Sequence, residues 1–174
     1  VGSIITTTGF VIADYTKWPM FSQMISIALM FVGACSGSTG GGMKVSRIVI
    51  YLKNAKKELK HLLHPHSIQT VEFEKNSIDD HVIVNIHAYL ALYLAIFAVS
   101  LLILTFFSLD FESAFSAVAT CLNNVGPGLG VVGPVNNFSS LSDISKFVLS
   151  FDMLAGRLEI FPILLLFAPS QWRK

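Results

Sequence analysis

Apolar runs of two different lengths alternate with polar segments along the chain. The longest, Val82 to Leu109, holds 28 residues without Asp, Glu, Lys or Arg, which exceeds the roughly 20 that a helix needs to cross a bilayer. Two further runs, Phe21 to Ala34 and Phe111 to Asn124, hold only 14 residues each. At about 1.5 Å per residue, 14 helical residues cover about 21 Å of a hydrocarbon core about 30 Å thick. The pattern therefore predicts one full membrane span and two shorter membrane segments.

The first short run leads into a stretch that is too rich in glycine to stay helical. Residues 33–44 are GACSGSTGGGMK, with five glycines and three hydroxyl residues. Because glycine frees the backbone, the helix is expected to break here, at membrane depth. Such a break is tolerated only where protein buries it or where it lines a wet cavity. The break is therefore a candidate functional element, and Trp18 followed by Pro19 marks the start of its helix.

Beyond the break, Val45 to Leu63 has the periodicity of an amphipathic helix. Its predicted apolar stripe consists of Ile48, Leu52, Ala55, Leu59 and Leu62. The polar residues 64–80, which include Pro65, predict a loop that returns the chain to the membrane.

A final membrane helix is predicted after a loop rich in Gly, Asn and Ser. Ser142 and Asp143 suit the cap of a helix expected over residues 144–168. Seven of the 12 Lys and Arg residues lie between positions 44 and 75, and the chain ends in SQWRK. The positive-inside rule then predicts that residues 44–81 and the C-terminus are cytoplasmic.

Composition supports a membrane protein. The chain is 53% hydrophobic and 13% charged, with a mean hydropathy of +0.65. A net charge of +1 gives no reason to expect nucleic acid as a partner. Cys35 and Cys121 lie far apart in apolar or Gly/Ser surroundings, so we interpret them as unpaired. No basic region leads into an apolar leader, so we expect no signal peptide and interpret the chain as the C-terminal part of a longer protein.

Two glycine loops carry the candidate ion chemistry. One is TTTGF, residues 6–10, and the other is NVGPGLG, residues 124–130, at the end of the second short helix. A cation filter needs backbone carbonyls that point at one axis, and glycine permits the necessary dihedral angles. The carbonyl end of a helix is also the negative end of its dipole. An ordinary turn is the alternative for each loop, but their equivalent positions in a repeated order of helix, short helix, loop and helix favour a filter.

Arg157 is expected in the middle of the last helix. An arginine at membrane depth costs a few kcal/mol or more unless it faces a cavity or a partner. Glu159 lies about 200° further round a helix and Asp152 is five residues back, so neither is a natural same-face partner. An arginine that extends toward the cytoplasmic interface is the alternative.

Other chemistry is less well supported. His61, His64 and His66 lie in a basic segment without Cys or carboxylate ligands, so we interpret them as part of a solvated turn rather than a metal site. GSTGGGMK lacks the Lys followed by Ser or Thr of a phosphate-binding loop. Because no pairing of a nucleophile with a base is evident, an enzyme is not expected.

Four motifs together resemble one known family. TTTGF, GACSGSTGGGMK, NNVGPG and AGRLEI, in this order, resemble the Trk/Ktr/HKT superfamily of potassium uptake proteins, most closely the bacterial Trk-type transmembrane subunit. The resemblance covers nearly the whole chain. It implies an all-α membrane protein built from four M1–P–M2 repeats, each a helix, a re-entrant pore helix with its filter loop, and a second helix. Residues 1–63 would end repeat three, with a gating loop at 33–43; residues 64–81 would form a cytoplasmic loop and residues 82–174 the whole of repeat four.

The resemblance also implies roles for particular residues. Ions would be coordinated by the backbone carbonyls of Thr7, Thr8, Gly9, Asn124, Val125 and Gly126. The pore would be gated by the intramembrane loop and one arginine, through Gly37, Gly40, Gly41, Gly42 and Arg157. Potassium would be the substrate and the metal held at the filter, with no covalently bound cofactor.

Further partners follow from the resemblance alone. It implies membrane lipid, a homodimer and a cytosolic nucleotide-binding regulatory subunit that docks on the basic face, all at the bacterial inner membrane. An ion-coupled secondary transporter that binds a solute at the broken helix is the alternative function. Saturable flux that depends on a proton or sodium gradient would distinguish it.

Overall fold

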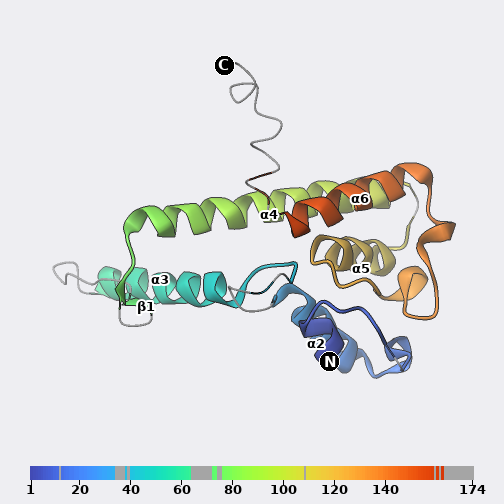
Figure 1. The fold of residues 1–174 in the computed structure, drawn as a ribbon, viewed down its shortest axis with the longest axis horizontal. Coiled ribbons are helices and arrows are strands. Elements are labelled where there is room, and N and C mark those ends of the chain that lie inside the picture. The colour runs from blue at the N-terminus through green and yellow to red at the C-terminus, as the bar shows by residue number, and fades with distance from the viewer. Residues whose placement is uncertain are drawn as a thin grey trace, which may run out of the picture.

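The computed structural model describes residues 1–11, 13–33, 38, 40–63, 72–73, 76–107, 109–158, 160 and 162. The described chain is predominantly helical (Figure 1). The α-helices are α1 (Gly2–Ile5), α2 (Met20–Phe31), α3 (Val45–Leu63), α4 (Asp80–Phe106), α5 (Phe111–Leu122) and α6 (Asp143–Arg157). The 3-10 helices are η1 (Tyr15–Lys17), η2 (Gly130–Val132) and η3 (Phe138–Ser140), and the strands are β1 (Glu72–Phe73) and β2 (Asn76–Ser77).

The predicted break in the first membrane helix is confirmed. The helix α2 ends at Phe31 and α3 begins at Val45. The two sides of the break are joined by a parallel bridge between Val32 and Met43, and the backbone N–H of Gly33 donates to the carbonyl of Met43 at 2.9 Å. Residues 34–37 and 39, including Cys35, lie outside the described residues.

The helix α4 is the predicted full span. Within the described residues, His81–Phe106 alone is both long and apolar enough to cross a membrane, with a mean hydropathy of 2.4 over its most apolar window. Figure 1 shows α3 beside the first half of α4, and α5 and α6 beside its second half. The two short apolar helices, α2 and α5, match the predicted partial spans.

Two local predictions differ from the structure. The segment predicted as a polar loop contains β1 and β2, which pair antiparallel; residues 64–71, 74 and 75 lie outside the described residues. The last helix was expected to continue to residue 168, but α6 ends at Arg157, with a bend at Leu158; beyond it, Ile160 and Pro162 are again helical. Residues 159, 161 and 163–174, with the predicted interfacial tail, lie outside the described residues.

The apolar stripe predicted on α3 is largely exposed. Leu52, Leu59 and Leu62 are 62%, 64% and 77% exposed, whereas the buried positions are Ile50 and Asn54. Periodicity identified the helix correctly but not its packed side. The reason is that α4 covers α3 along a neighbouring face, so part of the apolar stripe lies outside the contact.

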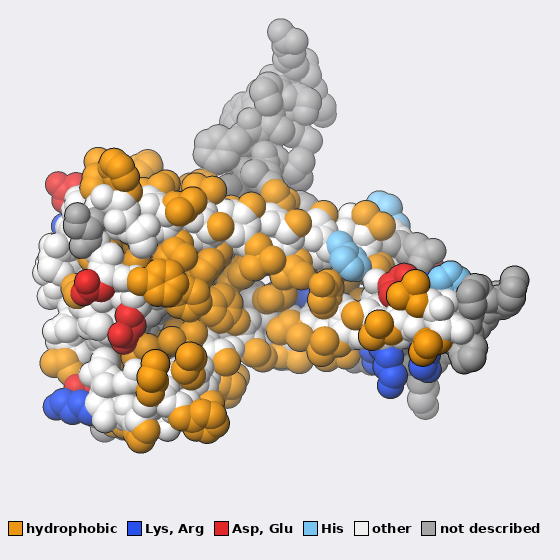
Figure 2. Space-filling view, turned by 180° about the vertical axis from the view of Figure 1, so that it is seen from behind, with side chains coloured by type: hydrophobic (Ala, Val, Ile, Leu, Met, Phe, Trp, Pro, Cys, Tyr) orange, Lys and Arg blue, Asp and Glu red, His pale blue; other side chains and the backbone are white. Residues whose placement is uncertain are grey.

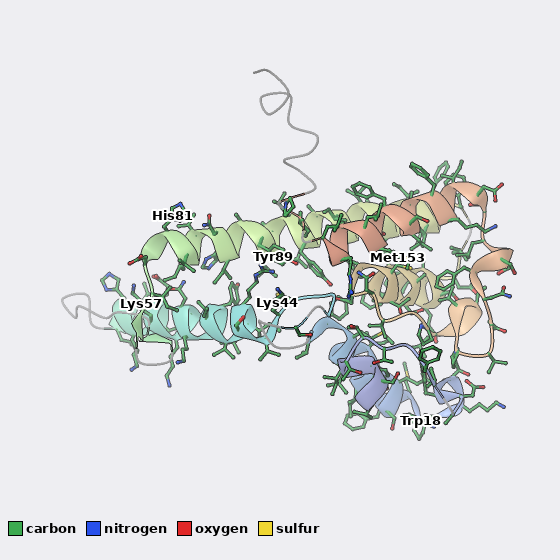
Figure 3. All side chains as sticks on the ribbon, in the orientation of Figure 1. Trp18, Lys44, Lys57, His81, Tyr89 and Met153 are labelled. Atoms are coloured by element: carbon green, nitrogen blue, oxygen red, sulfur yellow. The ribbon has the colours of Figure 1, made fainter. Side chains whose placement is uncertain are left out.

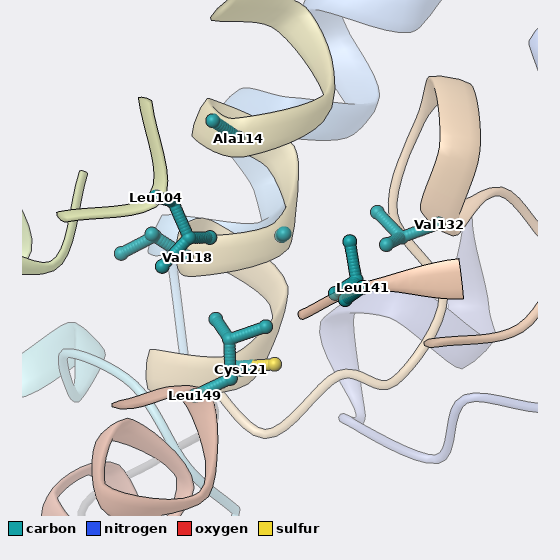
Figure 4. Close-up of a cluster of buried hydrophobic side chains, with 8 residues drawn as sticks. Leu104, Ala114, Val118, Cys121, Val132, Leu141 and Leu149 are labelled. Carbon is teal, nitrogen blue, oxygen red and sulfur yellow. The ribbon is translucent and has the colours of Figure 1, made fainter. Parts of the chain in front are cut away.

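The short helix α5 lies at the centre of the fold. Nine of its twelve residues are buried, many of them small. Figure 4 shows the main apolar cluster, in which side chains of α4 and α6 and the following loop pack around α5. Its buried members are Leu104, Ala114, Ala117, Val118, Cys121, Val132, Leu141 and Leu149. Cys121 is a free thiol in this cluster, as predicted.

The surface of the described residues is strongly apolar, as expected for a membrane protein. Phe10, Phe106 and Phe147 are 84%, 83% and 77% exposed. Figure 2 shows hydrophobic side chains across the middle of one face, with most of the visible Lys and Arg toward its two ends. Charge at the ends and apolar side chains between them is the distribution that a bilayer favours.

Candidate ion-binding and gating site

The two predicted filter loops share one backbone pattern. Thr7 and Gly9 have φ of 51° and 79°, and Asn124 and Gly126 have φ of 55° and 110°. Left-handed φ is uncommon for residues other than glycine, yet both loops adopt it at two positions separated by one residue. In a regular strand the carbonyl groups of successive residues point in alternate directions. Left-handed residues at every second position remove this alternation and let neighbouring carbonyls point to the same side.

The structure brings the two loops together. A Cβ atom on Gly9 would overlap the carbonyl oxygen of Val125, and a Cβ atom on Gly126 would lie 3.7 Å from the Cα of Gly9. Both loops also follow the C-terminal end of a helix, α1 or α5. The negative end of the α5 dipole is therefore next to the second loop, which suits a cation.

Side chains of α5 hold the chain that follows the second loop. The hydroxyl of Thr120 donates to the carbonyl of Pro127 at 3.2 Å. The hydroxyl of Ser116 accepts from the backbone N–H of Leu129 at 3.0 Å. Since both hydroxyl residues are fully buried, the loop is supported by fixed protein groups rather than by water.

Tyr15, which follows the first glycine loop in the sequence, also supports the second loop. Its side chain is 1% exposed, and its hydroxyl donates to the carbonyls of Pro127 at 2.8 Å and Gly128 at 2.9 Å. Burial raises the pKa of Tyr15 to about 12, so the hydroxyl keeps its proton at neutral pH. These two carbonyls are thus engaged by protein groups.

Asn123 marks the end of α5, just before the second loop, and is completely buried. The hydroxyl of Tyr93 on α4 donates to its side-chain oxygen at 2.9 Å. Its own amide nitrogen donates to the carbonyl of Ala119 at 2.7 Å. The side chain is therefore held by hydrogen bonds from both ends.

Two of the predicted gating glycines, Gly41 and Gly42, lie against the same asparagine. A Cβ atom on Gly41 would lie 2.6 Å from the carbonyl oxygen of Asn123, and one on Gly42 would lie 2.6 Å from its side-chain oxygen. Gly42 also has a left-handed φ of 78°. The described end of the glycine loop is thus in direct contact with the base of the second filter loop; Gly37 lies outside the described residues.

Arg157 is the last residue of α6, so the expectation that it lies in the middle of a helix is wrong. The end position is favourable because a positive charge there complements the helix dipole. The residue lines a cavity of about 250 Å³ together with Ser38, Gly40, Gly42, Lys44, Gly156 and Leu158. The structure thus brings Arg157 to the same cavity as two of the predicted gating glycines.

Close packing of α6 against the second loop escaped the sequence analysis. A Cβ atom on Gly156 would overlap the carbonyl oxygen of Leu122, and the side-chain nitrogen of Asn124 donates to the carbonyl of Met153 at 3.1 Å. Figure 3 shows Met153 on α6 above α5. The available signal was the small pair before Arg157 in AGRLEI, which is typical of close helix contacts in membranes.

Asp152 has a different environment from the one considered in the sequence analysis. It is completely buried, and the hydroxyl of Ser100 on α4 donates to its Oδ1 at 2.8 Å. The carboxyl group therefore connects α6 to α4. Tyr15, Tyr93 and Asn123 were also missed by the sequence analysis, because contacts between distant parts of the chain leave no local pattern.

Comparison with known proteins gives consistent matches along the chain. The sequence model of the cation transport protein family TrkH matches residues 2–174. The Trk system potassium uptake protein TrkH of Escherichia coli (strain K12) is 38% identical over 174 residues, which cover all of this chain and 36% of the relative. The protein of the same name from Vibrio parahaemolyticus serotype O3:K6 is 42% identical over 171 residues, covering 98% of this chain and 35% of the relative.

A solved structure matches equally well. The crystal structure of the potassium transporter TrkH from Vibrio parahaemolyticus gives a TM-score of 0.87 at 40% identity, covering 98% of this chain and 36% of that chain. The chain spans about a third of the length of the relatives it matches. The predicted fold class, a helical membrane protein with M1–P–M2 repeats, is confirmed.

Proposed function

Because the chain belongs to the TrkH family of cation transport proteins, we propose that it forms part of a potassium uptake pore in the bacterial inner membrane. Residues 1–63 end one M1–P–M2 repeat, with a gating loop at 33–43, and residues 82–174 form the next. Residues 64–81 and the C-terminus are cytoplasmic, so α4 runs outward. Related proteins named as potassium uptake proteins support this assignment.

The shared geometry of the two glycine loops carries the proposal. Their left-handed residues occur at matching positions, and the loops touch at Gly9 and Val125. Carbonyls turned to one side replace the water around a potassium ion without a charged side chain. The coordinating carbonyls are those of Thr7, Thr8, Gly9, Asn124, Val125 and Gly126.

The glycine loop and Arg157 form the gate. The loop closes under the filter through Gly37 and residues 40–42, and its described end already contacts Asn123. Arg157 faces the same cavity, where its positive charge repels an approaching potassium ion more strongly than in bulk water. Because the loop has no regular helical ladder to break, it can move at modest cost.

Regulation comes from outside the pore. The helix α3, which begins just after the break, presents Lys53, Lys56 and Lys60 on exposed positions from its middle onward. A cytosolic nucleotide-binding subunit docks on this basic face. Movement of α3 then moves the glycine loop, which ends where α3 begins. The complete protein is a homodimer in lipid and needs no covalently bound cofactor.

The direct test is potassium uptake in potassium-starved cells that lack their own transporters, with a complete subunit that contains this chain and its regulatory partner. The variant Gly126→Ser forces a side chain onto a residue with φ of 110°. Gly2→Ser is the matched control, because a Cβ atom there meets nothing within 4 Å. Uptake is expected to survive in the control and to be lost or become sodium-permissive in Gly126→Ser.

Two other outcomes would count against the proposal. An unchanged potassium to sodium ratio in Gly126→Ser would exclude the second loop from the filter. If the normally expressed subunit does not restore uptake of potassium, and instead moves a solute with saturable, gradient-dependent flux, the secondary transporter becomes the better assignment.

A further inference from the structure

Asn123 connects the two elements to which filter and gate are assigned above. It precedes the filter residue Asn124, and its backbone and side-chain oxygens face Gly41 and Gly42 of the glycine loop. The side-chain amide cannot turn freely, because Tyr93 donates to its oxygen and its nitrogen donates to Ala119. One residue with a fixed side chain therefore contacts the glycine loop and precedes the filter residues directly in the chain.

Tyr93 is itself fixed by packing that reaches the other side of the break. It is 2% exposed, and its ring stacks on Tyr89 at 6.4 Å between centroids. The guanidinium carbon of Arg47, on α3, lies 4.1 Å from the centroid of the Tyr89 ring. Figure 3 shows Tyr89 on α4 facing the start of α3 near Lys44. Contacts are thus continuous from α3 to the base of the filter.

We propose that Tyr93 and Asn123 act as a positioning pair that links the closed glycine loop to the shape of the filter. This inference rests on the proposed function of both elements. The Tyr93 hydroxyl fixes the Asn123 amide, and the amide determines how closely Gly42 approaches and where the filter backbone begins. Neither residue contacts the ion; both act through the backbone of their neighbours. Because coupling between two sites is reciprocal, ion occupancy of the filter and closure of the loop must then influence each other.

The first experiment compares Tyr93→Phe with Tyr51→Phe in a complete subunit with its regulatory partner. Both changes remove one phenolic hydroxyl, but Tyr51 is 38% exposed and lies away from the filter, on α3. The potassium to sodium uptake ratio is expected to fall several-fold in Tyr93→Phe, up to the roughly tenfold that would result if the whole free energy of one buried hydrogen bond were expressed in selectivity, and to stay unchanged in Tyr51→Phe. The pair Tyr93→Phe and Asn123→Ala should be non-additive, since each removes the same bond.

A second experiment stays informative if Tyr93→Phe does not fold. Gly42→Ala places a methyl group against the side-chain oxygen of Asn123, whereas Gly41→Ala places one against its backbone carbonyl. Both should raise potassium leak several-fold in the closed condition. Adding Asn123→Ala should lower the leak of Gly42→Ala, because it removes the obstructing oxygen, but not that of Gly41→Ala.

The outcomes separate the inference from the function on which it rests. Equal leak in the two double variants, or an unchanged ion ratio in well-folded Tyr93→Phe, overturns the positioning pair while potassium uptake by the unmodified subunit still stands. Failure of the unmodified subunit to take up potassium overturns the proposed function, and the inference with it. The pair is supported if Asn123→Ala lowers the potassium leak of Gly42→Ala but not that of Gly41→Ala, and if the potassium to sodium uptake ratio falls in Tyr93→Phe.

Discussion

Gly9 approaches Val125 so closely that a Cβ atom on the glycine would overlap the valine's carbonyl oxygen. The two residues belong to the two glycine loops that are proposed above as filters of different repeats, so the contact is a direct joint between these loops. Because the two loops are in contact here, the backbone of one loop cannot move without displacing the other.

This joint predicts unequal effects of alanine at two glycines. Both Gly9 and Gly126 have left-handed φ, which costs about 1–2 kcal/mol for a residue with a Cβ atom. A Cβ atom on Gly126 only touches the Cα of Gly9 at 3.7 Å, an ordinary contact, whereas one on Gly9 must displace Val125. We expect Gly126→Ala to reduce ion selectivity several-fold and Gly9→Ala to abolish uptake, measured in the same starved cells. Equal losses would show that crowding at the joint is unimportant.

The Tyr15 hydroxyl predicts a stability effect that is insensitive to pH in the ordinary range. Tyr15→Phe removes the buried donor of the Gly128 carbonyl and one of the two donors of the Pro127 carbonyl, which keeps its bond from Thr120, and should lower the free energy of unfolding by about 1–3 kcal/mol. The folded-state pKa is raised to about 12, so the contribution is complete below the ordinary tyrosine pKa of about 10 and is lost only above it. Thermal unfolding in detergent at about pH 6 and pH 9 should therefore give the same difference between the two proteins.

Tyr51→Phe is the control for this measurement, because that hydroxyl belongs to a partly exposed residue of α3. A loss of stability as large in the control as in Tyr15→Phe would mean that the bonds to Pro127 and Gly128 are not its source. A difference that disappears at about pH 9 would contradict the raised pKa.

The sequence predicted the elements better than their contacts. Runs of 28 and 14 apolar residues correspond to α4 and to the short helices α2 and α5, because bilayer thickness fixes the length that a span requires. The glycine-rich break between α2 and α3 was equally clear, since composition alone disfavours a helix there. The end of α6 at Arg157 was not predicted, although Pro162 offers a local signal, because a proline clashes with the carbonyl four residues before it, here that of Leu158.

The candidate site was only partly accessible from the sequence. Glycines in TTTGF and NVGPGLG identified the loops because their left-handed residues need that freedom at Gly9 and Gly126. The side chains that support the loops come from distant positions, as in the bond from Tyr15 to Pro127. The packed face of α3 was misjudged for the same reason, since it depends on where α4 lies.

Arg157 predicts a change in basal flux. If its charge helps to close the pore, Arg157→Ala should raise potassium flux several-fold in the closed condition, and Arg157→Lys should stay near the parent because the charge is kept. Lys146→Ala is the control: it removes a positive charge from the opposite end of α6, where Lys146 pairs with Asp143 at 3.3 Å. Lower flux in Arg157→Ala at normal expression would instead indicate a role in folding.

Gly156 predicts how tightly α6 must lie on the pore helix. Its Cβ position coincides with the carbonyl oxygen of Leu122, so Gly156→Ala must push α6 away from α5. Overpacking of this kind costs about 1–3 kcal/mol, which should appear as a lower unfolding temperature in detergent. The same displacement should break the bond from Asn124 to the carbonyl of Met153, so selectivity should fall along with stability. Gly2→Ala, in open space, should change neither; a stable Gly156→Ala with normal selectivity would show that α6 can shift without disturbing the filter.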